Sequence, residues 1–375
     1  MSQIDIVQVE SRSQLNQFIA YPNRLYKGDP HYVAPLTMER KAFFGFDKNP
    51  FYKTARVKLF LAFENRRIAG RIATCVNFTH NECHSEKTGF FGFFDCEDNY
   101  DVASKLLKVA MIELKREGME KMRGPANFST NHECGFLVDG FDMPPMVMMT
   151  YNRPYLPRLA EKFGLKKGMD LLAYRMTSKQ SFPERITKMV DRVRTRSGVT
   201  IRPINMRNFR SEVAEIRQIY NQAWENNWGF VPMTEEEFKH MAKDLKQVVD
   251  PELVLIAEHE GKPVAFAMAI PDINQALIKL NGKLLPFGML KLLWHTKIRN
   301  KVNSFRVVTL GVIPEYQKRG IDAWLYWTLY HRGTEIGYTW AEFSWILESN
   351  ELMRRGLEQL GSEIYKRYRL VEMPI

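Results

Sequence analysis

Hydrophobic and polar positions recur along the chain with spacings of about 2 and about 3.6 residues, and the stretch Phe305–Ala323 shows both in succession. Pro314 ends the first half of this stretch, and Gly320 opens the second. The first half is typical of a strand buried on both faces because it crowds together Val307, Val308, Leu310, Val312 and Ile313. The sequence therefore predicts a strand, a tight basic turn and the start of a helix.

Elements of both kinds fill the rest of the chain. Strands are predicted at residues 4–9, 57–63, 68–76, 89–94, 253–258, 263–270 and 339–347, and helices at residues 11–19, 102–114, 186–193, 212–224 and 351–360. Strands that alternate with helices along one chain predict the α/β class.

The order of elements recurs in the two halves of the chain. A strand at Gly89–Phe94, a helix and a strand that ends near Met122 are matched by a strand at Arg306–Val312, a helix and a strand at Thr339–Leu347. The simplest interpretation is a duplicated unit, in which each copy is a mixed, twisted sheet flanked by helices. We expect an N-terminal unit at residues 1–180, a linker at residues 181–200 and a C-terminal unit at residues 201–375.

The turn at Gln317–Asp322 has the composition of an anion site. Unpaired amides in the first turn of a helix and the helix dipole favour a pyrophosphate there, and Gly320 lets a ligand approach the backbone. The N-terminal copy has the acidic stretch Glu97–Asp101 at the same place, which would repel a pyrophosphate. We therefore expect the donor site in the C-terminal copy. The alternative is an ordinary connection with a basic surface cluster.

At Gln317 and Gly320 the turn resembles motif A of the GNAT acyltransferase superfamily, which usually has a small residue where this chain has Asp322. Over nearly all of its 375 residues, the chain resembles a bacterial family of tandem GNAT-like proteins. Relatives of that family include bacterial ceramide synthases, which acylate the amine of a long-chain base. The stretches that carry the resemblance are NRLYKGDPHYVAPL, RIAGRIA, GFFGFFD, RGPANFSTN, GFLVDGFDMPP and YKRYRLVEM.

The resemblance implies two GNAT-like units, acyl-CoA or acetyl-CoA as the donor substrate, and no metal. The pantetheine would lie in a splay between the strands Arg306–Val312 and Thr339–Leu347, where backbone amides near Leu310 and Gly311 would polarise the thioester carbonyl. The expected donor-binding residues are Leu310, Val312, Gln317, Lys318, Arg319, Gly320, Ile321 and Asp322.

Polar residues follow the last of these strands and are candidates for the chemistry. Glu348 could take a proton from the amine, directly or through water, and Asn350 could contact the donor. Ser349 or Asn350 could instead cap the helix at residues 351–360.

The acid that protonates the leaving thiolate is harder to place. GNAT enzymes often use a tyrosine seven residues after the position that resembles Asn350, but this chain has Leu357 there. We expect Tyr365, Tyr368 or solvent in that role, and the departure also leaves room for a catalytically silent protein.

A second polar cluster follows a strand end in the N-terminal copy, within GPANFSTNHECGFLVDG. Asn127, Asn131 and Glu133 are candidates for binding the acceptor, because sites of open sheets lie beyond strand ends. Caps and turns are the equal alternative for such residues.

Charge points to further partners. The formal net charge is +11, and the segment Ala276–Val302 holds six Lys or Arg and no acid among many apolar residues, including Leu290, Leu293, Trp294 and Ile298. This segment could be an interfacial helix or the lining of an acyl groove, or a core helix with snorkelling lysines. Positive charge attracts nucleic acid, anionic lipid and acidic carrier proteins alike, and charge alone does not choose among them. We expect an anionic membrane surface and an acyl carrier protein as partners rather than nucleic acid.

The sequence favours a cytoplasmic protein, at most peripheral to the inner leaflet. Its four cysteines form no CxxC pair, and no apolar run of 18 residues is present.

His80, Cys83 and His84 are close in sequence but lack a second group of ligand residues, so we expect no metal.

These features together predict N-acyl transfer from an acyl thioester, on CoA or acyl carrier protein, to the amine of a long-chain base or another lipid-like molecule. The alternatives are a small-molecule N-acetyltransferase, a Fem-like aminoacyl transferase and a lipid-binding module without enzymatic activity. RNA use would require a continuous basic face, and lipid use would require an apolar groove.

Overall fold

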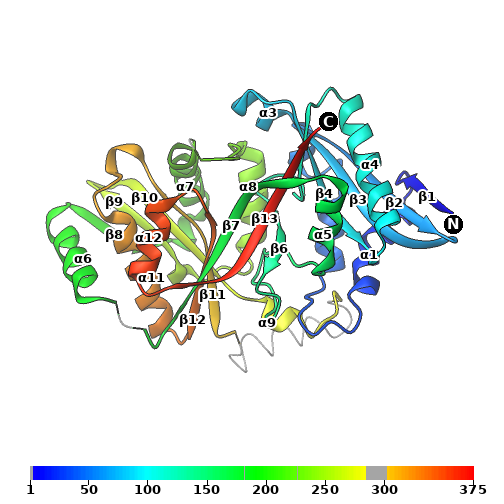
Figure 1. Ribbon diagram of the computed structural model, residues 1–375. Coiled ribbons are helices and arrows are strands. Elements are labelled where there is room, and N and C mark those ends of the chain that lie inside the picture. Colours follow the sequence, from blue (N-terminus) through cyan, green and yellow to red (C-terminus); the bar gives the residue numbers. More distant parts are fainter. Residues whose placement is uncertain (1–2, 181, 226, 284–301) are drawn as a thin grey trace. The chain divides into compact units, whose positions relative to one another are not determined.

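The structure is a computed structural model that describes residues 3–180, 182–225, 227–283 and 302–375 (Figure 1). The chain divides into two compact units. Of the described residues, unit 1 contains 3–171, 276–283 and 366–375, and unit 2 contains 172–275 and 302–365. Both units combine sheets with helices, so the expected α/β class is confirmed.

Unit 1 has a sheet in which one pair of neighbouring strands is parallel. Its strands, in spatial order, are β1 (Ile4–Gln8), β2 (Ala55–Glu64), β3 (Arg67–Asn77), β4 (Thr88–Cys96), β5 (Lys121–Gly124) and the end of β13 (Glu363–Pro374), with β6 (Phe136–Asp139) also paired to β13. The pair β4–β5 is parallel and the other pairs are antiparallel. The strand β7 (Lys166–Thr177) comes after β6 in the chain and continues into unit 2.

Helices complete unit 1. They are α1 (Arg12–Leu25), α2 (Thr37–Phe43), α3 (Phe78–His84), α4 (Tyr100–Arg116) and α5 (Tyr155–Phe163), with a 3-10 turn at Pro50–Lys53. Ser11 begins α1 with a capping box, and Asn99 caps α4 through the Asp101 amide at 2.9 Å. Apolar residues of α4 and α5 share one core with the sheet, including Leu106 and Leu156, both fully buried.

Unit 2 repeats this plan. Its strands, in spatial order, are the end of β7, β12 (Trp340–Leu347), β11 (Ser304–Val312), β10 (Lys262–Pro271), β9 (Val254–His259) and β8 (Val199–Pro203). The pair β11–β12 is parallel, as β4–β5 is in unit 1, and the pairs from β11 to β8 are antiparallel. The duplicated strand order predicted from the sequence is therefore present.

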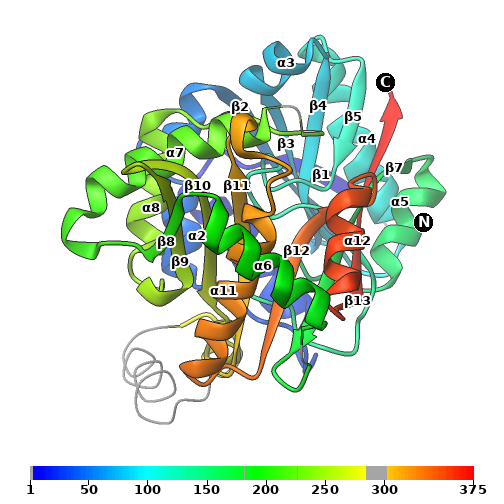
Figure 2. The same ribbon diagram turned by 90° about the vertical axis from the view of Figure 1, so that its left-hand side faces the viewer.

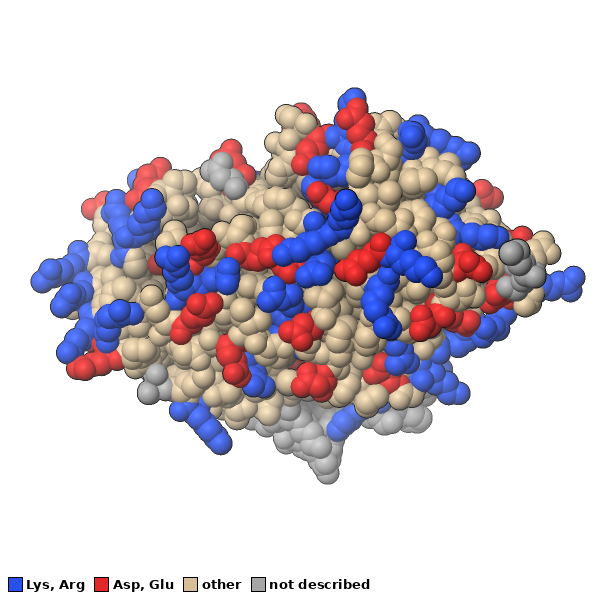
Figure 3. All heavy atoms as spheres, in the orientation of Figure 1, with Lys and Arg blue, Asp and Glu red and all other residues tan. Residues whose placement is uncertain are grey.

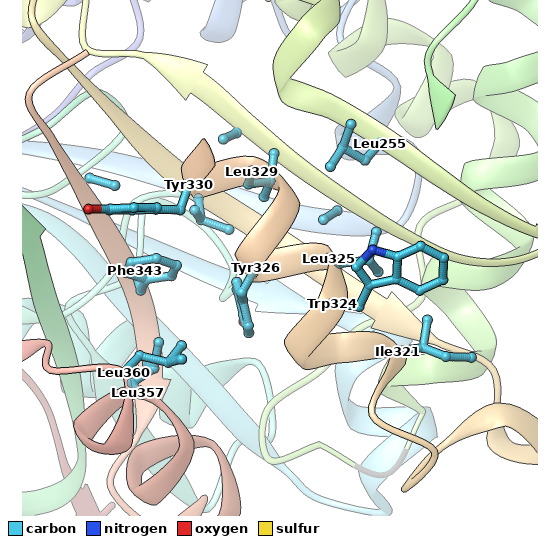
Figure 4. Close-up of a cluster of buried hydrophobic side chains, with 14 of the residues drawn as sticks. Leu255, Ile321, Trp324, Leu325, Tyr326, Leu329, Tyr330, Phe343, Leu357 and Leu360 are labelled. Carbon is cyan, nitrogen blue, oxygen red and sulfur yellow. The ribbon is translucent and has the colours of Figure 1, made fainter. Parts of the chain in front are cut away.

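The helices of unit 2 cover both faces of its sheet. They are α6 (Glu184–Arg196), α7 (Phe209–Trp224), α8 (Glu235–Leu245), α11 (Ile321–Glu335) and α12 (Glu351–Gln359), with 3-10 turns at Met206–Asn208, Pro251–Leu253 and Pro314–Tyr316. The short helix α9 (Asn274–Leu277) begins in unit 2 and ends in unit 1. One face packs against α6, α11 and α12 (Figures 2 and 4), and the other packs against α7 and α8. Leu325 and Leu329 of α11 lie at the centre of the first core and are fully buried.

The structure divides the chain differently from the sequence prediction. The expected linker at residues 181–200 contains α6, and Ile186 and Val190 of this helix are buried in the core of unit 2 because their spacing places both on one helical face. Lys366–Pro374 joins unit 1, where Val371 pairs with Gly124 of β5. The last strand of the chain thus completes the sheet of the first unit.

The basic and apolar segment Ala276–Val302 lies mostly outside the described residues. Of its first eight residues, Ala276, Leu277 and Leu280 are buried, and the Gly282 carbonyl accepts a hydrogen bond from the Thr37 amide at 3.1 Å. Leu290, Leu293, Trp294 and Ile298 are not among the described residues, so the amphipathic segment stays a prediction. No helix in the described ranges combines the length and apolar character needed to cross a bilayer.

Candidate active site

A fork between two parallel strands lies at the centre of unit 2. β11 and β12 pair from Ser304 opposite Trp340 to Val307 opposite Phe343, and both strands then continue beyond the pairing, to Val312 and Leu347. A bulge shifts the register of β11 against β10 at the same place, between Met268 and Ala269. The two strands thus stop pairing with each other beyond Val307 and Phe343, at the place where the family resemblance implies a splay.

One hydrogen bond and one buried hydroxyl group lie on the β11 side of the fork. The indole Nε1 of Trp224, on α7, donates to the Leu310 carbonyl at 3.1 Å. The Thr309 hydroxyl is buried and has no hydrogen-bond partner within the described part of the chain. Thr309 pairs with Met268, which packs on the α7 side, so its side chain faces α7. A buried hydroxyl in this position can bind a polar ligand atom.

The basic turn after β11 leads into an uncapped helix. Gly320 is the N-cap of α11 and has a φ of +79°, and no side chain caps the helix. The Trp324 amide makes the first intrahelical bond, to the Gly320 carbonyl at 3.1 Å. The amides of the three preceding helical residues therefore point out of the helix end, where they and the dipole favour an anion.

The side chains of the turn are held in defined ways. Gln317 Nε2 donates to the Val312 carbonyl at 3.0 Å, which fixes the turn to the strand end. The Arg319 guanidinium lies 4.8 Å from the centre of the Tyr316 ring, and Lys318 and Asp322 are exposed. Asp322 is in the first helical turn, where an acidic side chain interacts favourably with the dipole.

The role of Gly320 differs in part from the expected one. A Cβ at this position would come within 3.0 Å of Val193 Cγ2 in α6, and the positive φ disfavours any L side chain. The glycine is thus required by the turn and by the approach of α6. Ile321 and Val312 are buried in the core, so a donor could reach these two residues only through their backbones.

A buried polar network lies just before the fork. Glu342 Oε1 accepts a hydrogen bond from Ser344 Oγ at 2.5 Å, and its other oxygen accepts one from the Tyr365 hydroxyl. Arg306 Nε donates to Ser344 Oγ at 2.8 Å and lies 3.5 Å from Glu342 Oε1. The fractional exposures of Glu342, Arg306 and Ser344 are 0%, 2% and 4%.

Strand geometry places this network on the α7 side of the sheet. Arg306 and Glu342 are register partners in the parallel pair. Val307 and Phe343, which follow them, pack in the core on the α11 side. Because successive side chains of a strand point to opposite faces, Arg306 and Glu342 point away from α11.

The predicted catalytic residues have different surroundings. Asn350 caps α12, since its Oδ1 accepts from the Met353 amide at 3.2 Å, which matches the capping alternative. Glu348 is half-buried, and its carbonyl accepts a hydrogen bond from Arg354 at 2.9 Å. Tyr365 belongs to unit 2, whereas Tyr368 is fully buried in unit 1. The catalytic roles of Glu348, Asn350 and Tyr365 stay predictions.

The corresponding strand pair of unit 1 is closed by the chain itself. A Cβ on Gly92 of β4 would lie 1.9 Å from the Ala126 carbonyl oxygen, so the chain after β5 touches β4 directly. The Ala126 amide donates to the Phe91 carbonyl at 2.7 Å, and Asn127 Oδ1 accepts from the Phe93 amide at 2.7 Å. This pair therefore has no open fork like that of β11 and β12.

The predicted acceptor residues lie in this closing loop. Asn127 Nδ2 donates to Glu133 at 3.3 Å, Glu133 pairs with Arg40 at 2.5 Å, and the Asn131 amide donates to Ser129 Oγ at 3.2 Å. These bonds hold the loop together, as the alternative of turns and caps requires. Whether Asn127, Asn131 and Glu133 also bind an acceptor stays a prediction.

Three residues of the network, Arg306, Glu342 and Ser344, were missed by sequence reasoning, and the two charged ones left a signal. Arg306 and Glu342 are single charged residues within otherwise apolar strands, SFRVVTLGV and WAEFSWIL. A charged residue at a buried strand position requires a partner, and this signal could have singled out both. Within residues 3–180, 182–225, 227–283 and 302–375, no cluster of three or more His, Cys, Asp or Glu is arranged to hold a metal ion.

Comparison with known proteins finds a family model over part of the chain and relatives over nearly all of it. The model of the acetyltransferase (GNAT) family matches residues 213–361. Protein YghO of Escherichia coli (strain K12) is 39% identical over 370 residues, which cover 97% of this chain and 94% of that protein. A bacterial ceramide synthase of Caulobacter vibrioides is 37% identical over 374 residues, 98% of this chain and 97% of that protein.

Solved structures share the fold at low sequence identity. A tandem GNAT protein from the clavulanic acid biosynthesis pathway has a TM-score of 0.56 and 9% identity, and covers 99% of this chain and 98% of its own. A GCN5-related N-acetyltransferase from Sphaerobacter thermophilus has a TM-score of 0.54 and 13% identity, with coverages of 99% and 95%. The chain therefore belongs to the bacterial tandem GNAT-like acyltransferase family, whose members include a bacterial ceramide synthase, and it is an N-acyltransferase.

Proposed function

We propose that this protein transfers an acyl group from acyl-CoA to the amine of a lipid-like acceptor, of which a long-chain base is the leading candidate. The observation that carries the donor part is the fork of unit 2, followed by the basic turn and the uncapped N-terminus of α11. A thioester would lie beside the backbone of β11 beyond its pairing with β12, and a pyrophosphate would meet the amides at the start of α11 that make no intrahelical bond.

The fork supports one donor site, in unit 2. The pantetheine arm would follow the backbone of β11, where Leu310 and Gly311 lie beyond the paired section of the strands. The exposed side chains of Lys318 and Arg319 would form charge-assisted contacts with the pyrophosphate and partly neutralise its negative charge. In unit 1, the loop that closes the equivalent strand pair supports the absence of a second donor site.

The acceptor is proposed from the relatives and from charge. A relative named bacterial ceramide synthase is 37% identical over nearly the full length of both chains, which supports an amine on a long chain as the nucleophile. On the face shown in Figure 3, acidic and basic side chains are interspersed, so this face does not favour a polyanion such as RNA. An acyl carrier protein as donor and an anionic membrane as a docking surface remain further proposals.

A chain-length series tests the proposal. Purified protein is given acetyl-, octanoyl- or palmitoyl-CoA with sphinganine, and with a short primary amine as comparison, and the amide product is measured by mass spectrometry. We expect long-chain amide from palmitoyl-CoA and sphinganine, and little product from the short amine, because each buried methylene is worth about 0.8 kcal/mol. Transfer of acetyl groups to short amines alone would favour the small-molecule acetyltransferase instead.

A further inference from the structure

We propose that the buried network before the fork is the proton acceptor of the reaction, with Tyr365 in contact with the amine and Glu342 behind it. This inference rests on the proposed function, and it names the group that prepares the acceptor for attack. It assigns to Glu342 the role that the sequence suggested for Glu348.

The network has four side chains, those of Arg306, Glu342, Ser344 and Tyr365, and their solvent exposures indicate which one can contact the substrate. Glu342 is fully buried and cannot touch an amine that enters from solvent, and Arg306 and Ser344 are almost fully buried. Tyr365 alone of the four is half-buried, and its hydroxyl donates to Glu342 Oε2. A proton can therefore reach Glu342 through the phenol.

Hydrogen bonds set the direction of the transfer. Ser344 Oγ accepts from Arg306 Nε at 2.8 Å and donates to Glu342 Oε1 at 2.5 Å, so it is engaged as donor and as acceptor. Arg306 lies 3.5 Å from Glu342 Oε1, and hydroxyl groups donate to both carboxylate oxygens, so Glu342 is the hydrogen-bond acceptor at the end of the network and can receive the phenolic proton. The Tyr365 hydroxyl then has its own proton directed at that carboxylate.

The reaction balances with this network alone. An ammonium proton of the acceptor passes to the oxygen of Tyr365 while the phenolic proton passes to Glu342. The freed nitrogen lone pair forms the C–N bond at the thioester carbon, the C–S bond breaks, and the thiolate takes the second amine proton. The products are the amide and the free thiol of CoA, and Glu342 later returns one proton to solvent through Tyr365.

A purely structural role is the alternative, because a buried Arg–Glu pair can also serve to specify strand pairing. The two roles differ in what a charge-neutral replacement does. Glu342→Gln alone leaves Arg306 buried without its carboxylate and could destabilise unit 2. Glu342→Gln combined with Arg306→Gln removes both charges, so a structural role predicts recovery and a proton-transfer role does not.

The test measures kcat against pH with palmitoyl-CoA and sphinganine, for wild type, Tyr365→Phe, Glu342→Gln and the double variant Arg306→Gln/Glu342→Gln. Tyr365→Phe leaves the ion pair in place, so it reports on proton transfer even if Glu342→Gln folds poorly. We expect the rate at neutral pH to fall by about 10²–10⁴-fold in each variant, as for loss of a general base. The rate should then rise with pH, as the free amine forms without assistance.

Hydroxylamine, which is largely unprotonated at neutral pH, serves as a second acceptor probe. We expect the variants to approach the wild-type rate with this nucleophile, because it needs no prior loss of a proton. Glu212→Gln is the matched control, since Glu212 is a buried carboxylate on α7 paired with Arg202 at 2.9 Å outside the network. This control should lower thermal stability without changing the pH profile.

Two results would overturn the inference. One is a double variant with the wild-type rate and pH profile, and the other is Tyr365→Phe with unchanged kcat on sphinganine; the proposed acyl transfer would survive both. If instead the wild-type protein transferred no acyl group to any amine tested, the proposed function would fall and this inference with it.

Discussion

His132 is a half-buried side chain whose surroundings favour the neutral ring. Its ring packs edge-on against Phe43 and Phe51, with centroid distances of 5.4 and 5.1 Å, and Nδ1 lies 2.9 Å from the Ser129 hydroxyl. Burial lowers the pKa of His132 from 6.5 to about 4, because the protonated ring would lose its hydration. The folded protein therefore binds this proton less readily than the unfolded chain does.

This shift predicts a pH dependence of stability. A folded-state pKa below the unfolded one means that the stabilisation is complete above pH 6.5 and is lost as the pH falls from 6.5 towards 4. One pKa unit corresponds to about 1.4 kcal/mol, so the loss should amount to a few kcal/mol. His132→Gln should weaken this dependence, measured as the difference in thermal midpoint between pH 7.5 and pH 5. Equal differences in the two proteins would contradict the assignment.

At the scale of elements, β13 shows how much of unit 1 depends on the end of the chain. Val371 and Leu370 are almost fully buried, and Val371 pairs with Gly124 of β5. Ile364, in the first part of the same strand, has an exposed fraction of 37%. The two ends of one strand thus differ in how much they contribute to a core.

Val371→Asp should destabilise unit 1 by roughly 3 kcal/mol or more, because it buries an unpaired charge and removes an apolar side chain from the core. The same change at Ile364 should have a small effect, since that side chain already contacts solvent. Denaturant titration and limited proteolysis of both variants would measure the difference. Comparable losses at the two positions would show that the C-terminal residues do not stabilise the first unit.

The elements that the sequence predicts well are those with a local signal. The strand, turn and helix from Phe305 onwards follow from hydrophobic spacing and from Pro314 and Gly320, and each acts within a few residues. Asn350 as a helix cap was one of two stated alternatives for the same reason. Local spacing cannot tell that α6 packs into unit 2 or that Lys366–Pro374 joins unit 1, because strand pairing between distant segments decides both.

The buried network could not be assembled from the sequence either. Arg306 and Glu342 are 36 positions apart and meet only because β11 and β12 pair in parallel with this register. The sequence does show one charge inside each apolar strand, but not which charges pair. Tyr365 was singled out from the sequence, and its hydrogen bond to Glu342 comes from the tertiary structure.

At the scale of the whole molecule, two units of one plan differ in whether the parallel strand pair opens. In unit 2, the strands diverge beyond Val307 and Phe343, and a basic turn follows. In unit 1, the chain after β5 lies against β4, where unit 2 has its fork. The helix α4, which follows β4, is capped by Asn99, and the acidic residues Glu97 and Asp98 precede this cap. This difference is the basis for proposing the donor site in unit 2.

Calorimetric titration of CoA into the full chain tests this account most directly. We predict one site per chain, an affinity reduced by about tenfold or more in Arg319→Glu through the lost charge-assisted contact, and an unchanged affinity in Asp98→Asn, which neutralises one charge in the acidic turn of unit 1. Two sites per chain, or wild-type affinity in Arg319→Glu together with a change in Asp98→Asn, would contradict the placement of the donor in unit 2.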